Sequence, residues 1–517
     1  MQHTNIDNNE EWKPTISPWL SAIPLMFGAF MFVLDETIAN VALPYMAGSF
    51  SISRQESMWI LTSYLIASGI VIPMVDWFSK VMGRKNFFML SILVFTIASF
   101  LCGIATSNSM MILCRILQGA GGGGILPIAQ ACLLEGFEPK MRGKVMAMFG
   151  LVVVIAPIIG PVIGGWLTIN WSWPFIYFIN VPIGIISLIL SHKLIEDPPY
   201  ARKKTGVKTD FVGFAFLTMW LVTLQVVLDK GNDEDWFGSP FITRLAIICV
   251  ISLIAFIISQ LKNKEPLVDL RVLKDKNYLI GTFVQVIMQG VMLASMAILP
   301  QFLQSLMGYD AFLSGMTMMT RGIGACIALA ICGYLAEKVD NRWLVAFGLG
   351  LMGLAGWMLG GLNLQISAIN VELPNLIFGL GMGFAMVPII ALSVITIPNE
   401  QMTNASGLQN LLKIIGGAIG TSIVATMLSR FSQVHQHMLV DNLTPLNEVY
   451  AQKLQAYSSA FMTNVDPSTA TYLGQKMLYN EMLQQASLWS FIDSFRIYAI
   501  ACVIIIPLVF LVKTIKK

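Results

Sequence analysis

The stretch FVLDETIANVALP, residues 32–44, places two adjacent carboxylic acids, Asp35 and Glu36, inside a long apolar segment that begins at Trp19. A helix rises about 1.5 Å per residue, so an apolar segment of this length can cross a bilayer. A charge at that depth costs about 2.5–3.5 kcal/mol on the insertion scale. Charged residues inside a span are therefore functional candidates, provided that the rest of the chain is built for a membrane.

The composition is that of an integral membrane protein. Hydrophobic residues make up 56% of the 517 residues and charged residues only 12%, whereas soluble domains average about 25% charged residues. The mean hydropathy is +0.71. The net charge of +3 does not point to nucleic acid, and the seven cysteines lie in apolar segments. Such cysteines fit small buried side chains better than disulfides or metal ligands, so we expect no metal site.

Fourteen apolar segments are long enough to span a bilayer. Their approximate limits are 18–45, 57–78, 87–106, 109–133, 145–168, 173–192, 211–229, 241–261, 278–303, 312–335, 343–363, 372–397, 404–428 and 491–512. With both termini inside, 22 Lys and Arg residues fall on the cytoplasmic side, seven fall outside, and three (Arg115, Arg321 and Lys413) lie within spans. This excess of inner positive charge predicts cytoplasmic termini.

Two pairs of stretches repeat at nearly the same offset. LPYMAGSFSIS, from Leu43, is echoed 256 residues later by LPQFLQSLMGY, from Leu299. DWFSKVMGRKNFF, from Asp76, is echoed 257 residues later by GYLAEKVDNRWLV, from Gly333. The ninth and tenth spans thus correspond to the first and second, and two six-helix halves in parallel order are the pattern of the major facilitator fold.

The spans and the repeat together predict an all-α membrane protein of the major facilitator fold with 14 transmembrane helices. We expect four regions, described from the N-terminus onward. They are a cytoplasmic tail at 1–17, a six-helix half at 18–195, an inserted two-helix hairpin at 210–262 and a second six-helix half at 277–513, which includes an external loop at 430–490.

Several stretches resemble the fourteen-span drug:proton antiporter family of the major facilitator superfamily, and most closely its EmrB subgroup. They are LDETIANVALP (34–44), GRK (83–85), RILQGAGGGG (115–124), APIIGPVIGGWL (156–167), WSWPFIYFINVPIG (171–184) and LDKGNDEDWF (228–237). The family's loop motif usually has an acid where this chain has Lys80, whereas the second half has Glu337 at the matching place. The arrangement of inner-gate charges is therefore expected to differ in the first half.

The resemblance implies roles for two sets of residues. The antiporter motif of the fifth span comprises Pro157, Gly160, Pro161, Gly164 and Gly165, and the cytoplasmic gate loop comprises Gly83, Arg84 and Lys85. Proline bends a membrane helix and frees carbonyl groups, while glycines allow helices to approach closely. The fifth span is thus a candidate hinge, with simple packing as the alternative.

Nucleotide binding is not expected from this sequence. GAGGGG contains the GxGxxG pattern, but it lies in a membrane span and follows no strand. No GxxxxGK[ST] motif occurs. The energy for transport should come from a proton gradient, without a cofactor.

Asp35, Glu36 and Arg115 are the candidates for proton coupling. Asp35 lies roughly 15 Å below the outer end of its span at Tyr45, and Arg115 roughly 9 Å below that surface. The difference is about the reach of an arginine, so the two can pair if the first and fourth spans face each other. Glu36 points about 100° away around the helix. A static ion pair is the alternative for Asp35, and a structural role is the alternative for Glu36.

Arg321, Lys413, Asn40 and Gln118 are assigned to a substrate cavity. The second half has no acid deep in the membrane to pair with Arg321 or Lys413, and an uncompensated buried cation is costly unless water or an anion reaches it. We therefore expect both to line a wet cavity that favours neutral or anionic amphipaths. Methionines near these residues suit varied ligands, although they are also ordinary lipid-facing residues.

The leading hypothesis is a proton-driven multidrug efflux transporter in the bacterial cytoplasmic (inner) membrane, and not an enzyme. The alternative is a proton-coupled carrier for a single metabolite, while the full motif set argues against a receptor or scaffold. The expected partners are hydrophobic drugs, protons and the lipid bilayer, with no nucleic acid. The resemblance also implies a periplasmic adaptor protein and an outer-membrane channel, with the periplasmic loop at 430–490 as one candidate contact.

Overall fold

The computed structural model describes most of the chain as helices. The described residues are 16–52, 54–137, 139–197, 210–263, 266–309, 311–335, 338–365, 367–398, 401–462 and 465–513. Within these ranges, fourteen helical segments are long and apolar enough to cross a membrane. The predicted all-α membrane fold with 14 spans is therefore confirmed. The predictions for Glu337, for residues 1–15 and for the last four residues lie outside the described residues.

The first six spans come from the N-terminal part of the chain. Their elements are α1 (Pro18–Phe50), α2 (Arg54–Val71), η1 (Ile72–Met74), α3 (Val75–Met82), α4 (Arg84–Gly103), α5 (Asn108–Gly122), α6 (Ile125–Gly136), α7 (Pro139–Asn170), α8 (Phe175–Phe178) and α9 (Asn180–Leu194). The second and fourth spans are each assembled from consecutive short helices. The break between α5 and α6 falls within the glycine run of the fourth span.

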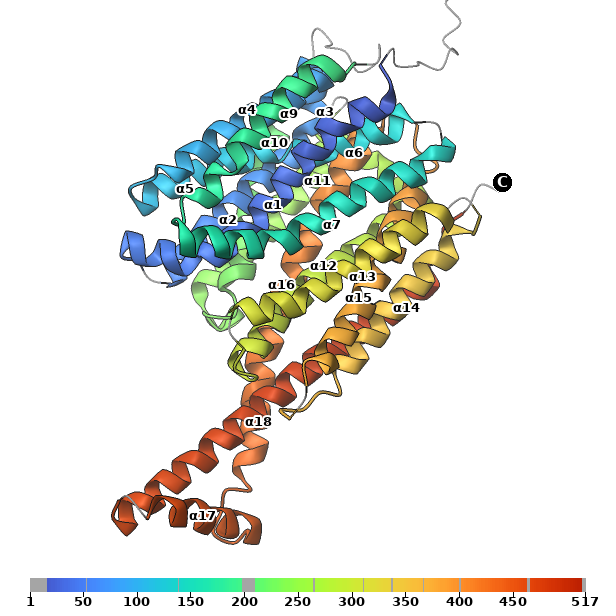
Figure 1. The fold of residues 1–517 in the computed structure, drawn as a ribbon. Helices are drawn as coiled ribbons and strands as arrows, with labels where there is room; N and C mark the ends of the chain where they lie inside the picture. The colour runs from blue at the N-terminus through green and yellow to red at the C-terminus, as the bar shows by residue number, and fades with distance from the viewer. Residues whose placement is uncertain are drawn as a thin grey trace, which may run out of the picture.

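Two further spans and then six more complete the bundle. They contain α10 (Phe211–Lys230), η3 (Trp236–Gly238), α11 (Pro240–Lys262), η4 (Leu270–Lys274), α12 (Lys276–Ser305), α13 (Ala311–Leu335), α14 (Asn341–Leu359), α15 (Ile369–Ser393), α16 (Met402–Val440), α17 (Glu448–Phe461), α18 (Pro467–Ile504) and α19 (Ile506–Val509). Figure 1 shows the helices of the bundle running roughly side by side, so their long axes define one common direction across the membrane.

The hairpin of α10 and α11 contacts both halves of the bundle. The Thr62 hydroxyl on α2 donates to Asp229 at 2.9 Å. The Ser422 hydroxyl on α16 donates to the carbonyl of Leu228 at 2.9 Å. Adjacent residues near the end of α10 therefore bind one helix from each half, which places the hairpin along the junction between the halves.

The two halves also meet through α6, α7, α15 and α16. Asn410 on α16 donates to the side-chain carbonyl of Gln130 on α6 at 3.2 Å, and the amide of Gln130 donates to Gln409 at 3.3 Å. A side chain added at Gly150 of α7 would lie 3.0 Å from Val387 of α15. The described halves are thus in direct contact through these helices.

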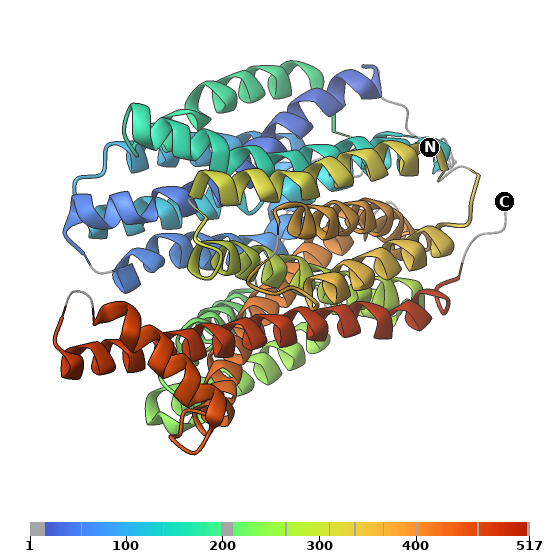
Figure 2. The same ribbon diagram turned by 60° about the horizontal axis from the view of Figure 1, so that its bottom comes forward.

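The prediction of a loop at 430–490 is wrong, because the segment is largely helical. α16 continues to Val440, α17 follows, and α18 begins at Pro467. The 39 residues of α16 correspond to about 58 Å, whereas the hydrocarbon core is only about 30 Å thick. Figure 1 and Figure 2 show α17 and the adjoining ends of α16 and α18 extending beyond the bundle. We call residues 430–490 the helical arm.

Local interactions explain why polar residues in the arm form helices rather than a loop. Asn447 caps α17 by accepting from the backbone amide of Val449 at 3.0 Å. Hydrogen bonds from the Ser468 hydroxyl and the Thr469 amide hold the pKa of Asp466, which caps α18, well below its usual range. Lys453 of α17 binds Glu481 of α18 at 2.7 Å, which raises the pKa of Lys453. The polarity of this segment reflects a solvated helical surface.

Candidate functional site

A buried ion pair joins the first and fourth spans. Arg115 on α5 lies 2.6 Å from the Oδ2 atom of Asp35 on α1, and both side chains are fully buried. The other carboxylate oxygen of Asp35 accepts from Gln118 at 2.8 Å and from Asn180 on α9 at 2.7 Å. The expected contact between Asp35 and Arg115 is therefore present, and Asp35 receives three polar donors from two further spans.

Arg115 has neutral partners besides the carboxylate. Its Nε atom donates to the carbonyl of Ile60 at 3.1 Å, and Nη1 donates to Gln118 at 2.8 Å. Its guanidinium also lies 4.1 Å from the ring centroid of Tyr64 on α2, a distance at which the ring face stabilises a cation. The arginine is thus held by three groups that carry no charge, in addition to Asp35. We call Asp35, Arg115, Gln118, Asn180 and Tyr64 the N-half polar cluster.

Glycines in the fourth span permit this close packing. A side chain at Gly119 would lie 2.3 Å from the carbonyl oxygen of Tyr64 on α2, and one at Gly122 would lie 2.7 Å from the ring of Phe32 on α1. Real Cβ atoms do not approach other atoms so closely, so only glycine fits at these contacts. The GAGGGG stretch therefore brings α5 close enough to its neighbours for Arg115 to reach Asp35.

We expect Gly119→Val to destabilise the protein because its side chain would meet the backbone of α2, which is not free to move aside. Overpacking of this kind costs about 1–3 kcal/mol. The measurement is thermal unfolding of the purified protein in detergent. Gly69→Val on α2 is the matched control, since nothing lies within 4 Å of a side chain added there. Equal losses in the two variants would contradict the proposed close approach.

Glu36 lies in a different environment from Asp35. Asp35 is fully buried, whereas Glu36 is half-buried and Asn40, one turn further along α1, is exposed. The amide of Asn40 donates to the backbone carbonyl of Glu36 at 3.4 Å. The adjacent acids therefore differ in access to solvent, as their positions around the helix predict.

The antiporter motif packs directly against the helix that carries these acids. A side chain at Gly160 would lie 2.4 Å from the hydroxyl of Thr37, and one at Gly164 would lie 2.7 Å from the side chain of Ile38. Both contacts join α7 to α1 within three residues of Asp35. α7 remains one helix through the motif's two proline positions, and the hinge role of the motif stays a prediction.

A second buried ion pair involves residues 83–85, the stretch predicted to be a cytoplasmic gate loop. Gly83 has φ 85° between α3 and α4, a conformation that favours glycine. Arg84 pairs with Glu135 at the end of α6, and their side chains are 5% and 2% exposed. The backbone amide of Lys85 donates to Asp197 at 2.9 Å. Sequence reasoning missed Glu135 and Asp197, although each is an acid close to the end of a span.

The charges of the first-half loop also differ from the usual motif. Lys80 stands at the position that the family gives to an acid, and it forms an ion pair with Asp76 one turn earlier, at 2.6 Å. The acid therefore lies at the start of α3 and the cation near its end, where each suits the helix dipole.

Arg321 on α13, which was expected to line a wet cavity, is buried against α12 and α15 in this structure. Its side chain is only 5% exposed. It donates to Asn375 on α15 at 2.8 and 3.1 Å and to Ser295 on α12 at 2.7 Å, and it lies 4.4 Å from the ring centroid of Phe378. Among the described residues, an amide oxygen, a hydroxyl and an aromatic face contact the cation in place of an acid, and its Nη1 atom is buried without a hydrogen-bond partner. We call these four residues the C-half polar cluster.

The two polar clusters are related by the internal repeat. Arg321 lies 257 residues after Tyr64, which is the offset of the second pair of repeated stretches. In the first half the arginine is on the fourth span and the ring is on the second. In the second half the arginine is on the equivalent of the second span and the ring is on the equivalent of the fourth. Each half thus stacks an arginine on an aromatic ring across its second and fourth spans, with the two partners on opposite helices in the two halves.

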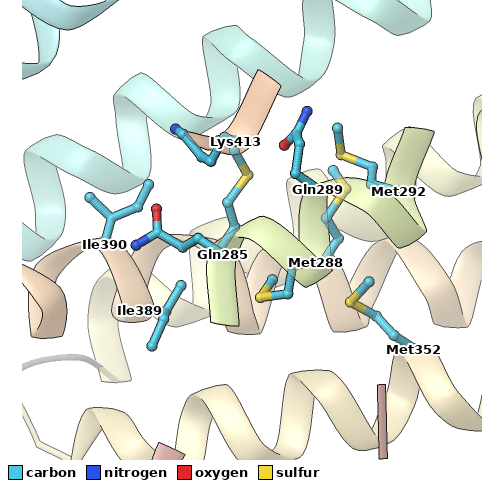
Figure 3. A pocket seen from close by; sticks show the side chains of 10 residues that line it. Gln285, Met288, Gln289, Met292, Met352, Ile389, Ile390 and Lys413 are labelled. Atoms are coloured by element: carbon cyan, nitrogen blue, oxygen red, sulfur yellow. The ribbon is translucent and has the colours of Figure 1, made fainter. Parts of the chain in front are cut away.

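Lys413 on α16 lines a small cavity of about 20 Å³ within the second half. The other lining residues come from α12, α14 and α15, and they are Gln285, Met288, Gln289, Met292, Met352, Met382, Met386, Ile389 and Ile390. Figure 3 shows Lys413 and Gln289 on one side of this pocket, with Met288 and Met352 on the other. We call it the methionine pocket. Of the residues assigned to a substrate cavity, Lys413 lines this pocket.

Gln118 and Asn40, which were also assigned to the substrate cavity, are not among the residues that line the methionine pocket. Gln118 is fully buried and bonded to Asp35 and Arg115, so its assignment to a cavity is wrong, because it serves the polar cluster. Asn40 is exposed on α1 but is not among the lining residues of the methionine pocket. Sequence reasoning did not identify Asn180, Asn375 and Ser295 as site residues. Each is a polar residue inside an apolar span, and that pattern was the signal that could have identified them.

The described residues thus form fourteen candidate spans, the two halves share a sequence repeat, and a charge cluster is buried between spans. This combination is typical of a secondary transporter of the membrane. The model of the Major Facilitator Superfamily matches residues 25–421. This chain belongs to that superfamily, and it is a multi-pass membrane protein.

Comparison with individual known proteins narrows the assignment within this superfamily. It is 32% identical over 461 residues to the multidrug export protein EmrB of Haemophilus influenzae, covering 89% of each chain. It is 30% identical to the fatty acid resistance protein FarB of Neisseria gonorrhoeae, covering 96% of each chain. Among solved structures, the proton:xylose symporter XylE matches with a TM-score of 0.60 at 12% identity, over 94% of each chain. The chain is thus EmrB-like in sequence, and XylE shares its fold.

Proposed function

We propose that this protein exports hydrophobic compounds in exchange for protons. Multidrug efflux of the major facilitator type is the assignment that its EmrB-like relatives give. We further propose that transport is coupled to protons and that the preferred substrates are neutral or anionic amphipaths. We also propose that the protein has no enzymatic activity and needs no cofactor. The observation that carries the proton coupling is the fully buried pair of Asp35 and Arg115.

The geometry supports Asp35 as the proton carrier. A proton on Asp35 removes its charge, and Arg115 then keeps the carbonyls of Ile60 and Gln118 and the ring of Tyr64. The arginine is therefore not left without partners, which would otherwise oppose protonation. Entry of one proton yields roughly 2.3 kcal/mol per 100 mV of membrane potential. That free energy becomes available to movements of α1 against α7.

Transport in inverted membrane vesicles tests this proposal. We expect a hydrophobic fluorescent substrate to accumulate when a proton gradient is imposed and to stop accumulating when the gradient is collapsed. Active transport that persists without the gradient would refute proton coupling. Transport of one metabolite and of no unrelated hydrophobic compound would favour a single-substrate carrier instead.

The proposed setting is the inner membrane of a bacterium, with both termini in the cytoplasm and the helical arm in the periplasm. The distribution of Lys and Arg supports this orientation. The proposal includes a periplasmic adaptor protein and an outer-membrane channel as partners. The extension of α17 beyond the bundle supports the helical arm as the adaptor contact.

The orientation makes a direct prediction. A reporter enzyme that works only in the periplasm should be active when fused after Gln455 in α17 and inactive when fused after Lys517. The positive-inside bias is the physical reason. A cytoplasm-active reporter at the same two positions is the control, and it should give the opposite pattern. Activity of the periplasmic reporter at Lys517 alone would reverse the topology.

A further inference from the structure

Buried amide side chains connect the two halves at the end of the bundle away from the helical arm. Gln130 on α6 donates to the side-chain oxygen of Gln409 on α16 at 3.3 Å and accepts from Asn410 at 3.2 Å. The three residues are 2%, 0% and 7% exposed. Gln409 lies seven residues after Met402, the start of α16, whereas the arm includes the other end of that helix. We call Gln130, Gln409 and Asn410 the amide latch.

A serine of the second half fixes the position of Gln409. The amide of Gln409 donates to the Ser393 hydroxyl on α15 at 2.7 Å. That hydroxyl also accepts from Gln285 on α12 at 3.3 Å and donates to the backbone carbonyl of Ile390 at 2.7 Å. A hydroxyl has one donor and two acceptor sites, so the hydrogen-bonding capacity of Ser393 is fully used. Because its amide is held in this way, Gln409 presents its oxygen to Gln130.

Close packing of α12 against α15 and α16 keeps this serine in place. A side chain added at Gly281 of α12 would lie 2.5 Å from the Cβ atom of Ser393, so only glycine fits there. The Tyr278 hydroxyl on α12 donates to the carbonyl of Ala405 on α16 at 2.7 Å. The hydrogen bonds then continue to Gln285, which lines the methionine pocket (Figure 3). Three helices of the second half are therefore fixed to one another around Gln409.

The members of the amide latch carry no charge, and they neither gain nor lose a proton at physiological pH. A buried ion pair at this place would leave an uncompensated charge when it is broken, which strongly disfavours separation. Separated amides can bind water instead, so each hydrogen bond between the halves changes the opening equilibrium by only roughly 2- to 10-fold. The latch therefore suits a contact that breaks and forms again in every transport cycle.

We propose that Gln409 is a positioning residue for the movement of the two halves. Ser393 holds its amide, its oxygen binds Gln130, and the amide latch keeps this end of the bundle closed. Transporters of this fold open to the two sides of the membrane in turn, as one repeat moves against the other. The stability of the latch therefore sets the fraction of the protein that is closed at this end. The inference rests on the proposed export function and names residues that act on its conformational step rather than on the substrate or the proton.

Hydrogen–deuterium exchange of the purified protein in nanodiscs tests this role. Gln130→Met keeps the length of the side chain but removes both hydrogen bonds of the latch between the halves, so the opening equilibrium should shift by roughly 4- to 100-fold. We expect faster exchange in α6 and in the first two turns of α16, and slower exchange at the end of α7 and the start of α13, where the opposite end of the bundle closes in turn. Ser393→Ala should give the same pattern with smaller changes, because Gln409 loses its anchor but can still bind Gln130.

A matched control distinguishes a shifted equilibrium from a general loss of stability. Gln260 is 1% exposed, and its side chain donates to Asp210 and accepts from the backbone amide of Val268, which joins the hairpin to the segment that follows it. Gln260→Met should therefore destabilise the protein without changing exchange in opposite directions at the two ends. Faster exchange at both ends in Gln130→Met, or unchanged exchange in either Gln130→Met or Ser393→Ala, would overturn the inference.

A transport measurement distinguishes this failure from failure of the proposed function. Inverted vesicles that contain the wild-type protein are assayed for uptake of a neutral hydrophobic dye in response to a proton gradient. If they take up no dye, the export function is wrong, whatever the exchange data give. If they take up dye while the variants lack the opposite changes at the two ends, export stands and the role of the amide latch is wrong.

Discussion

Replacing Asp35 with asparagine should abolish proton-driven export while the protein still inserts into the membrane. The amide keeps the shape of the side chain and one oxygen to accept from Gln118 and Asn180, but it carries no exchangeable charge. Arg115 retains the carbonyls of Ile60 and Gln118 and the ring of Tyr64. The variant should therefore bind substrate without coupling that binding to a proton gradient.

Substrate uptake by inverted vesicles across a range of pH measures this effect. Glu36→Gln is the matched control, because Glu36 is the neighbouring acid, is half-buried and lies outside the N-half polar cluster. We expect it to retain a proton-dependent uptake. If Asp35→Asn pumps normally at every pH and Glu36→Gln does not, the carrier is Glu36.

The second large effect is expected at Arg115. Arg115→Met leaves the fully buried Asp35 without a cation, and breaking a buried pair from one side costs about 3–5 kcal/mol. The variant should unfold at a markedly lower temperature in detergent and accumulate less in the membrane. Thermal unfolding of the purified protein and the amount of inserted protein are the two measurements.

A double variant tests the cause of that loss. Asp35→Asn combined with Arg115→Met removes both charges, so part of the lost stability should return even though two contacts are gone. Arg321→Met is the comparison in the second half. It should cost less, about 1–3 kcal/mol, because it leaves Asn375 and Ser295 short of a donor but leaves no buried carboxylate. Additive losses in the double variant, or an equal loss at Arg321, would contradict the electrostatic origin of the effect.

Hydrophobicity and charge placement were sufficient to predict the spans and the contact between Asp35 and Arg115. Spans are set by length and composition, which the sequence displays directly. The ion pair could be predicted from the depths of Asp35 and Arg115 in the membrane, because two opposite charges at similar depths on facing spans have few other partners. Depth alone does not give the rotation of each helix. That is why Gln118 was placed in a cavity, although it lies one turn from Arg115 on the face that meets Asp35.

The helical arm and the C-half polar cluster could not be predicted for different reasons. Polarity at 430–490 is compatible with either a loop or a solvated helix, and only caps such as Asn447 and Asp466 distinguish them. Arg321 was expected to need water because no acid was near in sequence. Its actual partners, Asn375 and Ser295, come from two other spans, and tertiary contacts of neutral groups leave little signal in a single sequence.

The exchange of arginine and ring between the two clusters has a consequence for the energetics of the transport cycle. In the first half the stacked guanidinium faces a carboxylate, whereas in the second half its described partners are an amide and a hydroxyl. Neither of those groups gains or loses a proton under physiological conditions. If Asp35 is the proton carrier, as proposed, the first-half cluster changes its charge state during turnover while the second-half cluster keeps a constant charge. External acidity would then act on the first half, and the second half would have to follow mechanically.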